Sequence, residues 1–213
     1  MEARSVGARE ADVAPAPDVM ASAGWTPANP GPLGLFGFAA TTFVLSMINA
    51  NLVGPRSGAV VLPLAIAYGG LAQLLAGMWE FRTGNTFGAV AFTSYGAFWI
   101  SVYVLLKLPA LAVTHSGFSL YLYAWTIFTF LMLIATLRTN GALVAVFLVL
   151  AITFLLLAIG NANLVGLQAT NGTIKIGGWL GILTAILAWY TGLAGLLSST
   201  FGREVLPVFP LNR

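Results

Sequence analysis

With 59% hydrophobic and only 7% charged residues in a chain of 213, this protein lacks the composition of a water-soluble domain, in which about a quarter of residues are charged. Its mean hydropathy of +0.92 indicates a lipid environment instead. Cysteine is absent, which excludes disulfides and thiolate metal sites. The net charge of +3 does not indicate nucleic-acid binding, because the few basic residues flank apolar segments. We therefore expect the lipid bilayer as a partner, no nucleic acid and no cofactor.

Residues 1–28 form the first segment of the chain. They contain Glu2, Glu10, Asp12 and Asp18, are rich in alanine, proline and serine, and lack the apolar core of a signal peptide. This composition predicts a disordered N-terminal tail.

Six apolar segments without any charged residue or histidine follow the tail. Each is about 19 to 22 residues long, and a helix needs about 20 residues to cross the ~30 Å hydrocarbon layer. A membrane barrel would instead need strands of about ten residues with alternating polarity. We therefore predict an all-α integral membrane protein, in which residues 29–197 form a six-helix bundle and residues 198–213 form a C-terminal tail. The predicted spans are 33–53, 60–79, 87–106, 118–137, 142–160 and 176–197.

The distribution of basic residues predicts how the bundle is oriented. An even number of spans places both termini on one side, where six basic residues stand against three on the other side. Because cytoplasmic loops carry an excess of Lys and Arg, we predict cytoplasmic termini and a position in the plasma membrane. The six are Arg4, Arg9, Arg82, Arg138, Arg203 and Arg213, and the three are Arg56, Lys107 and Lys175.

The first span opens with the stretch NPGPLGLFGFAATT, which begins at Asn29. Its prolines force an extended backbone before the helix, so that the free N–H groups of the helix N-terminus can face an anion. Phe38, Thr41, Thr42 and Leu45 then recur at helical spacing, and an aromatic ring beside hydroxyls suits a narrow gate. We expect Asn29, Thr41 and Thr42 to line a substrate path.

The second and third spans hold further polar residues at membrane depth. Gln73 has more donors and acceptors than its own helix can satisfy, so it bonds either a neighbouring helix or a ligand. Ser94 either bonds a carbonyl of its own helix or lies on the path. Glu80 is the only acid near a span, and it either pairs with Arg82 at the interface or serves as a proton-linked group at one pore mouth.

The lack of acids and histidine at membrane depth limits the chemistry. Neutral amides and hydroxyls suit a small anion or a neutral polar solute, because a central acid would repel an anion. The sole histidine, His115, lies in a predicted loop, so an intramembrane enzyme is disfavoured. A coupled transporter, a passive channel and a membrane protein that only assembles remain as alternatives.

Two further patterns concern the ends and faces of the helices. Small residues recur every three or four positions along the sixth span, which favours close helix packing within or between subunits. The sequence NANLVG occurs at Asn49–Gly54 and again at Asn161–Gly166. This echo is either chance or a shared need for polar residues at two helix mouths.

Several segments together resemble the acetate uptake transporter family. The opening stretch is similar to its NPAPLGL signature, and AYGGLAQLLAGMWEFRTGNTFGAVAFTSYGAFW (Ala67–Trp99) resembles its second and third helices. The segments LLAIGN (Leu156–Asn161), GGW (Gly177–Trp179) and FGREVLP (Phe201–Pro207) match its fifth helix, its sixth helix and its C-terminal tail. The departures are Gly31 in the signature, the long N-terminal tail and a divergent 107–117 loop.

The resemblance implies a six-helix protomer in a homohexamer, with a path in each subunit for acetate and similar short carboxylates, including succinate. It also implies uptake linked to protons, a hydrophobic constriction of Phe38, Tyr95 and Leu150, and control of substrate size by Leu150 and Ala188. We therefore predict a transporter rather than an enzyme. The alternative is a passive channel for small anions or neutral solutes.

Overall fold

The computed structural model describes residues 25, 27–107, 114–162 and 171–211, so most of the predicted N-terminal tail and part of the divergent loop lie outside the described residues. Six helices are long and apolar enough to cross a membrane, which confirms the predicted all-α membrane fold. Within the described part, the β-structure is an isolated bridge between Asn140 and Pro210. The spans are α1 (Gly31–Asn49), Ser57–Thr83, α4 (Thr86–Lys107), α5 (His115–Thr136), α6 (Gly141–Ala162) and α7 (Gly172–Phe201).

The second span is one continuous helical rod that changes its winding along its length. It consists of η1 (Pro55–Val60, 3₁₀), α2 (Val61–Ile66), η2 (Ala67–Ala72, π-helical) and α3 (Gln73–Thr83). At the end of η2 the N–H of Gln73 bonds to the carbonyl of Tyr68, five residues back. Such a π turn holds one more residue than an α turn and is common at functional sites. The wider turn lies against α1, where a Cβ on Gly37 would come within 2.7 Å of the Tyr68 carbonyl oxygen.

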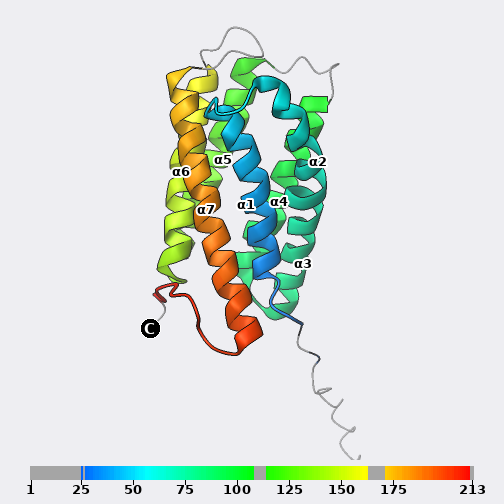
Figure 1. The fold of residues 1–213 in the computed structure, drawn as a ribbon, viewed down its shortest axis with the longest axis vertical. Coiled ribbons are helices and arrows are strands. Elements are labelled where there is room, and N and C mark those ends of the chain that lie inside the picture. The colour runs from blue at the N-terminus through cyan, green and yellow to red at the C-terminus, as the bar shows by residue number, and fades with distance from the viewer. Residues whose placement is uncertain (1–24, 26, 108–113, 163–170, 212–213) are drawn as a thin grey trace, which may run out of the picture.

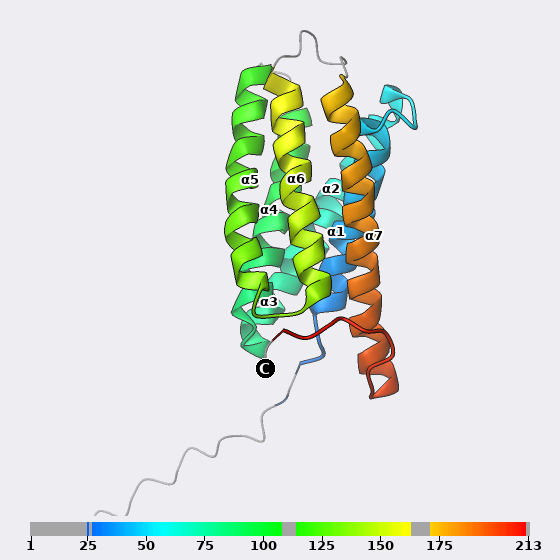
Figure 2. The ribbon, with the colours of Figure 1, turned by 90° about the vertical axis from the view of Figure 1, so that its left-hand side faces the viewer.

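Consecutive spans run in opposite directions, so α1 begins and α7 ends at the same end of the bundle (Figure 1). We call this the terminal end, and the other, where α1 ends and α5 begins, the mouth end. α1 packs along α7 on one side and against η2 and α3 on another, while α6 packs against both α5 and α7 (Figure 2). The backbones of α4 and α5 come close only over a short stretch, and aromatic side chains such as Tyr95, Phe98 and Trp125 lie between them. Helix packing therefore leaves room between α1, α4, α5 and α6.

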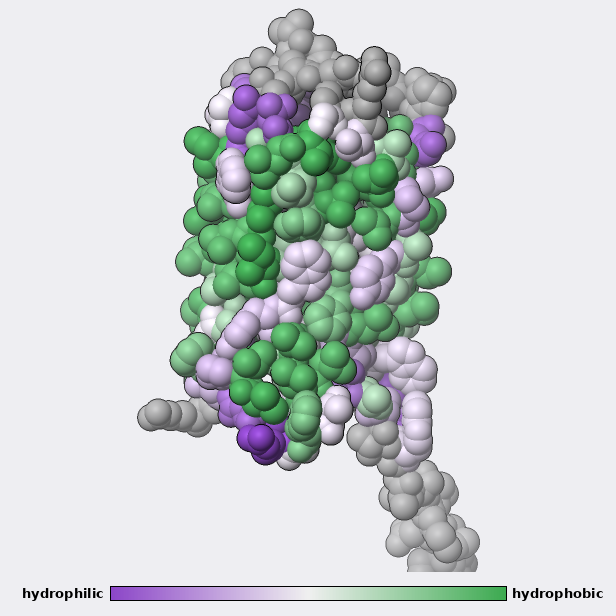
Figure 3. Space-filling view, in the orientation of Figure 1, coloured by the Kyte–Doolittle hydropathy of each residue, from purple (hydrophilic) through white to green (hydrophobic). Residues whose placement is uncertain are grey.

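The outer surface of the bundle is suited to hydrocarbon. Large apolar side chains project outward from the spans, with Leu120, Leu131 and Ile134 each more than 60% exposed. Figure 3 shows apolar residues over most of the middle of one face, and the most hydrophilic residues near its two ends. The protein is therefore a multi-pass membrane protein.

The small-residue face of α7 packs against α1 within the same protomer. A Cβ on Gly192 would lie 3.1 Å from the Cβ of Leu35, and Gly181 abuts Ser46 in the same way nearer the mouth end. Glycine at these positions lets the two helix backbones approach closely along their length.

The chain after α7 turns back across the terminal end. α7 continues to Phe201, beyond the predicted limit at residue 197. The N–H of Gly141, at the start of α6, donates to the carbonyl of Phe209 over 2.8 Å, which satisfies one of the N–H groups that a helix N-terminus leaves free. The hydroxyl of Tyr190 in α7 donates to the carbonyl of Pro207 over 2.7 Å. The C-terminal segment thus joins the start of α6 to α7.

We predict that Gly96→Ala destabilises the bundle, because a Cβ there would lie 2.7 Å from the backbone nitrogen of Leu74 and 2.9 Å from the carbonyl oxygen of Gly70. Overpacking of this kind costs about 1–3 kcal/mol. Thermal unfolding of the purified protein in detergent measures the effect. Gly172→Ala is the control, since a Cβ at Gly172 meets nothing within 4 Å, and equal unfolding temperatures for the two variants would contradict the packing described here.

Candidate functional site

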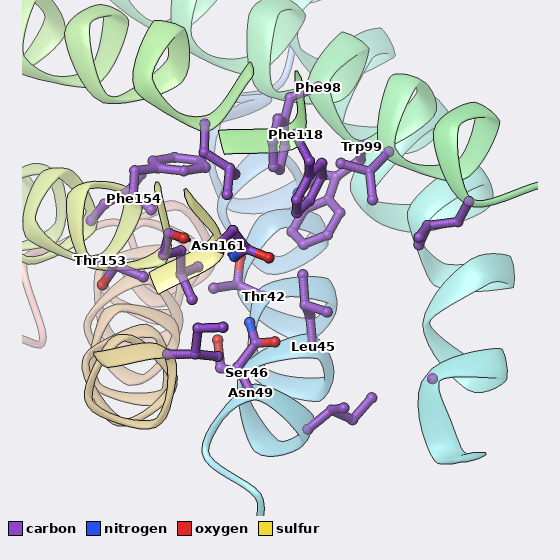
Figure 4. Close-up of a pocket in the computed structure, with 18 of the residues that line it drawn as sticks. Thr42, Leu45, Ser46, Asn49, Phe98, Trp99, Phe118, Thr153, Phe154 and Asn161 are labelled. Carbon is purple, nitrogen blue, oxygen red and sulfur yellow. Dashed lines mark hydrogen bonds between the residues drawn. The ribbon is translucent and has the colours of Figure 1, made fainter. Parts of the chain in front are cut away.

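A cavity of about 450 Å³ occupies the room between α1, α4, α5 and α6 and lies toward the mouth end. We call it the vestibule. One wall is a face of α1, on which the polar side chains Thr42, Ser46 and Asn49 follow one another (Figure 4). Its volume is within the range of small-molecule binding sites. The rest of its wall is mostly apolar and aromatic, including Leu45, Phe98, Trp99, Phe118 and Phe154.

The polar groups of the vestibule are hydroxyls, amides and the imidazole of His115 at the mouth end, and part of their hydrogen-bonding capacity is free. The hydroxyl of Thr42 is buried and has no hydrogen-bond partner. Asn161, at the end of α6, uses one amide hydrogen on the carbonyl of Leu157 at 2.7 Å, which leaves its other amide hydrogen and its oxygen available. Figure 4 shows Thr42, Asn49 and Asn161 directed toward the same space. The vestibule thus offers uncharged donors to a polar solute.

The vestibule narrows at Phe38 and Leu150, which also line a second cavity of about 20 Å³. Tyr95 lines this small cavity, and its ring centroid lies 5.6 Å from that of Phe38. All three side chains are at most 5% exposed. The structure therefore brings together the three residues predicted to form a constriction, between the two cavities.

Tyr95 is held in a fixed position by its hydroxyl and its ring. The Thr129 hydroxyl donates to the carbonyl of Trp125 over 2.7 Å, so its single proton is already used. In the 2.8 Å bond between the two hydroxyls, Tyr95 is therefore the donor and Thr129 the acceptor. The Tyr95 ring also packs edge-on against that of Phe128, with centroids 5.5 Å apart.

Gln73 lies beyond Phe38 and Leu150, on the wall of the small cavity. Its side chain is 1% exposed and its Oε1 has no hydrogen-bond partner. It follows directly after the π turn of η2. Within the described part of the chain, this oxygen makes no hydrogen bond to a neighbouring helix, and both expectations for the amide remain predictions.

Four of the predicted path residues line neither cavity. Thr41 precedes Thr42 by one residue and therefore lies on the side of α1 that faces η2, where Gly69 abuts it. Its hydroxyl donates to the carbonyl of Gly37 over 2.9 Å. Ser94 is half-buried outside both cavities, and Ala188 belongs to the buried apolar cluster that also contains Phe38 and Leu150. Asn29 is exposed at the terminal end, where its Oδ1 accepts from the N–H of Gly31 over 2.9 Å.

Glu80 lies at the terminal end, away from both cavities. Its side chain is 2% exposed, and Oε2 accepts from the Asn85 amide at 2.9 Å and from the Thr83 hydroxyl at 3.1 Å. A Cβ on Gly31 would lie 3.5 Å from its Oε1. The carboxyl group therefore lies beside the N-termini of α1 and α4. At the N-terminus of α1 we had expected an anionic substrate. The partners of the carboxyl group are Thr83 and Asn85 rather than Arg82, which is exposed.

Residue-by-residue reasoning missed most of the vestibule wall, including Trp99, Phe154 and Asn161. The repeated NANLVG was the available signal, since the first asparagine of each copy, Asn49 and Asn161, lines the vestibule. This shared position favours a common role at two helix ends over chance. Aromatic rings of apolar spans give no comparable signal, because most rings of this kind face lipid or core.

Six helices long enough to span a membrane, packed around an internal vestibule, define a multi-pass membrane protein with a cavity between its helices. Comparison with known sequences identifies the group: the profile of the GPR1/FUN34/yaaH family matches residues 13–213, and the chain belongs to this family.

Individual relatives are transport proteins rather than enzymes. The chain is 44% identical to acetate permease A of Emericella nidulans, over 85% of this chain and 65% of that protein. It is 39% identical to the succinate-acetate/proton symporter SatP of Escherichia coli K12, over 85% of this chain and 95% of that protein. A solved structure described as the bacterial acetate channel SatP superimposes with a TM-score of 0.77 at 39% identity, covering 85% of this chain and 99% of the other. The name SatP thus occurs with the description of a symporter and with that of a channel.

We predict that Thr129→Val destabilises the protein by about 1–3 kcal/mol, because the buried Tyr95 hydroxyl loses its acceptor. Tyr95→Phe in the same chain removes the stranded hydroxyl and recovers part of the loss. A double-mutant cycle on thermal unfolding measures the coupling between the two positions. An equal cost of Thr129→Val with and without the Tyr95 hydroxyl would rule out this hydrogen bond as a stabilising contact.

Proposed function

We propose that this protein carries acetate and other short carboxylates, succinate among them, across the plasma membrane, through a path inside each protomer of a homohexamer with cytoplasmic termini. We further propose that the path runs from the vestibule through the constriction of Phe38, Tyr95 and Leu150. The observation that carries the proposal is that Phe38 and Leu150 line both cavities and so separate them. The names of the relatives support the substrate class.

In the proposed mechanism, the vestibule replaces the water around the carboxylate. Carboxyl groups have a pKa of about 4, so the substrate arrives mostly ionised at neutral pH. The hydroxyls of Thr42 and Ser46 and the amides of Asn49 and Asn161 donate to its oxygens, and no acidic side chain lines either cavity to repel it. The methyl end of acetate meets the aromatic walls.

The constriction then selects by size. Three bulky side chains that are at most 5% exposed leave little free volume, so a short chain passes more easily than a long one. Beyond them, the unpaired Oε1 of Gln73 is the next polar group on the path. The hydrogen bond between the hydroxyls of Tyr95 and Thr129 holds the Tyr95 ring in a fixed position in the constriction.

We propose that the coupled proton travels with the acid itself rather than on Glu80, because Glu80 lines neither cavity. A passive anion channel is the second candidate. The absence of Asp and Glu from the walls of both cavities favours it, since the path then offers no carboxylate to carry a proton.

Uptake of labelled acetate by proteoliposomes, with and without an imposed pH gradient, tests the proposal. Protein-dependent uptake that rises with an inward proton gradient supports proton-linked transport. Uptake that follows only the acetate gradient and the membrane potential supports the channel. Absence of uptake by intact oligomers would refute transport of acetate.

We predict that Leu150→Ala or Phe38→Ala widens the range of transported acids. Removing either side chain opens the boundary between the two cavities, so lactate or butyrate uptake relative to acetate should rise several-fold. Competition between labelled acetate and the longer acids measures this ratio. Leu148→Ala is the matched control, because Leu148 is on the same helix but 44% exposed on its outer surface. An unchanged ratio in both constriction variants would refute the proposed selectivity filter.

We predict that Glu80→Gln retains acetate uptake and its response to a pH gradient. Gln keeps an oxygen that can accept from Asn85 and Thr83, but the weaker neutral acceptor lowers the unfolding temperature. Uptake at several imposed pH gradients, together with thermal unfolding, checks both parts. A folded variant that transports acetate but no longer responds to the gradient would identify Glu80 as the proton carrier instead.

A further inference from the structure

The mouth end of the bundle carries charge of one sign only. The segments that join the spans at this end contain Arg56, Lys107, His115 and Lys175, and in the full sequence they contain no Asp or Glu. In the sequence, the six acidic residues of the chain all precede α1, lie near the end of α3 or follow α7. They are Glu2, Glu10, Asp12, Asp18, Glu80 and Glu204.

The basic residues Lys107 and Lys175 lie next to lining residues of the vestibule along the chain, and His115 lines it. His115, the first residue of α5, is half-buried and lines the vestibule. Lys107 in α4 follows the lining residue Leu106, and Lys175 in α7 follows the lining residue Ile174. The remaining polar lining at this end consists of the neutral Asn49, Asn51 and Asn161.

This arrangement focuses a positive potential on the vestibule. A cavity with low-dielectric walls and charges of one sign at its rim raises the local concentration of the opposite ion, and such fields raise entry rates about 10-fold or more at low salt. Salt weakens the effect, because the screening length falls from about 30 Å at 0.01 M to about 3 Å at 1 M. A neutral acid does not respond to this field, whereas a carboxylate does.

We propose that the mouth of the vestibule is an anion-capture site for the ionised form of a small carboxylate, with Lys107 and Lys175 as its cations. The proposal rests on the proposed function and adds the charge state in which the substrate enters and the residues that attract it.

Initial acetate uptake by the full-length protein in proteoliposomes tests the inference, using vesicles sorted by an N-terminal tag so that the termini lie inside. At ~0.01 M salt, K107Q/K175Q should lower uptake about threefold or more, and at ~1 M salt it should match the wild type. Arg82→Gln with Arg203→Gln, two exposed cations of the terminal end, is the matched control and should leave uptake unchanged.

The high-salt measurement also shows that each variant is folded and competent. Equal uptake by K107Q/K175Q and the wild type at low salt would overturn the inference, as would a loss of the same size at both salt concentrations. If the wild type takes up no acetate under any condition, the proposed function itself fails, so the two failures are distinguishable.

Discussion

The close packing of α1 between α7 and η2 is the contact on which the rest of the structure depends. Gly181 and Gly192 of α7 and Gly37 of α1 remove the side chains that would separate these helices. With two sides of α1 in backbone contact, only a third side is free. That side carries Phe38, Thr42 and the polar residues toward Asn49, so the same packing that stabilises the bundle fixes which groups a solute meets.

Charge is separated along the molecule in a way that suits an anion. The one acid within a span, Glu80, is 2% exposed beside two helix N-termini, whose partial positive charge stabilises a carboxylate there. Its contacts are with Thr83 and Asn85, and it does not reach the walls of either cavity. The lining between the vestibule and Gln73 therefore has no formal negative charge among the described residues.

The six spans could be predicted from the sequence because each needs only an unbroken apolar run. The grouping of Phe38, Tyr95 and Leu150 could be predicted because motif resemblance gave their positions. Finer placement failed where one helical residue changes the face, as for Thr41, which bonds Gly37 while Thr42 lines the vestibule. The partners of Glu80 depend on how α3 meets α1 and α4, which no local pattern encodes. The return of the chain to Gly141 and the π turn likewise follow from tertiary contacts.

The π turn at Ala67–Ala72 sets the phase between the two halves of the second span. Its supernumerary residue advances everything after it by about 100° around the helix axis relative to a uniform α-helix. The first half meets α1 at Gly37, and the second half meets α4 where Gly77 abuts Thr93. Deletion of a single residue there would give a uniform α-helix but would rotate the Gln73 amide away from the small cavity. The length of this segment is therefore constrained as tightly as its composition.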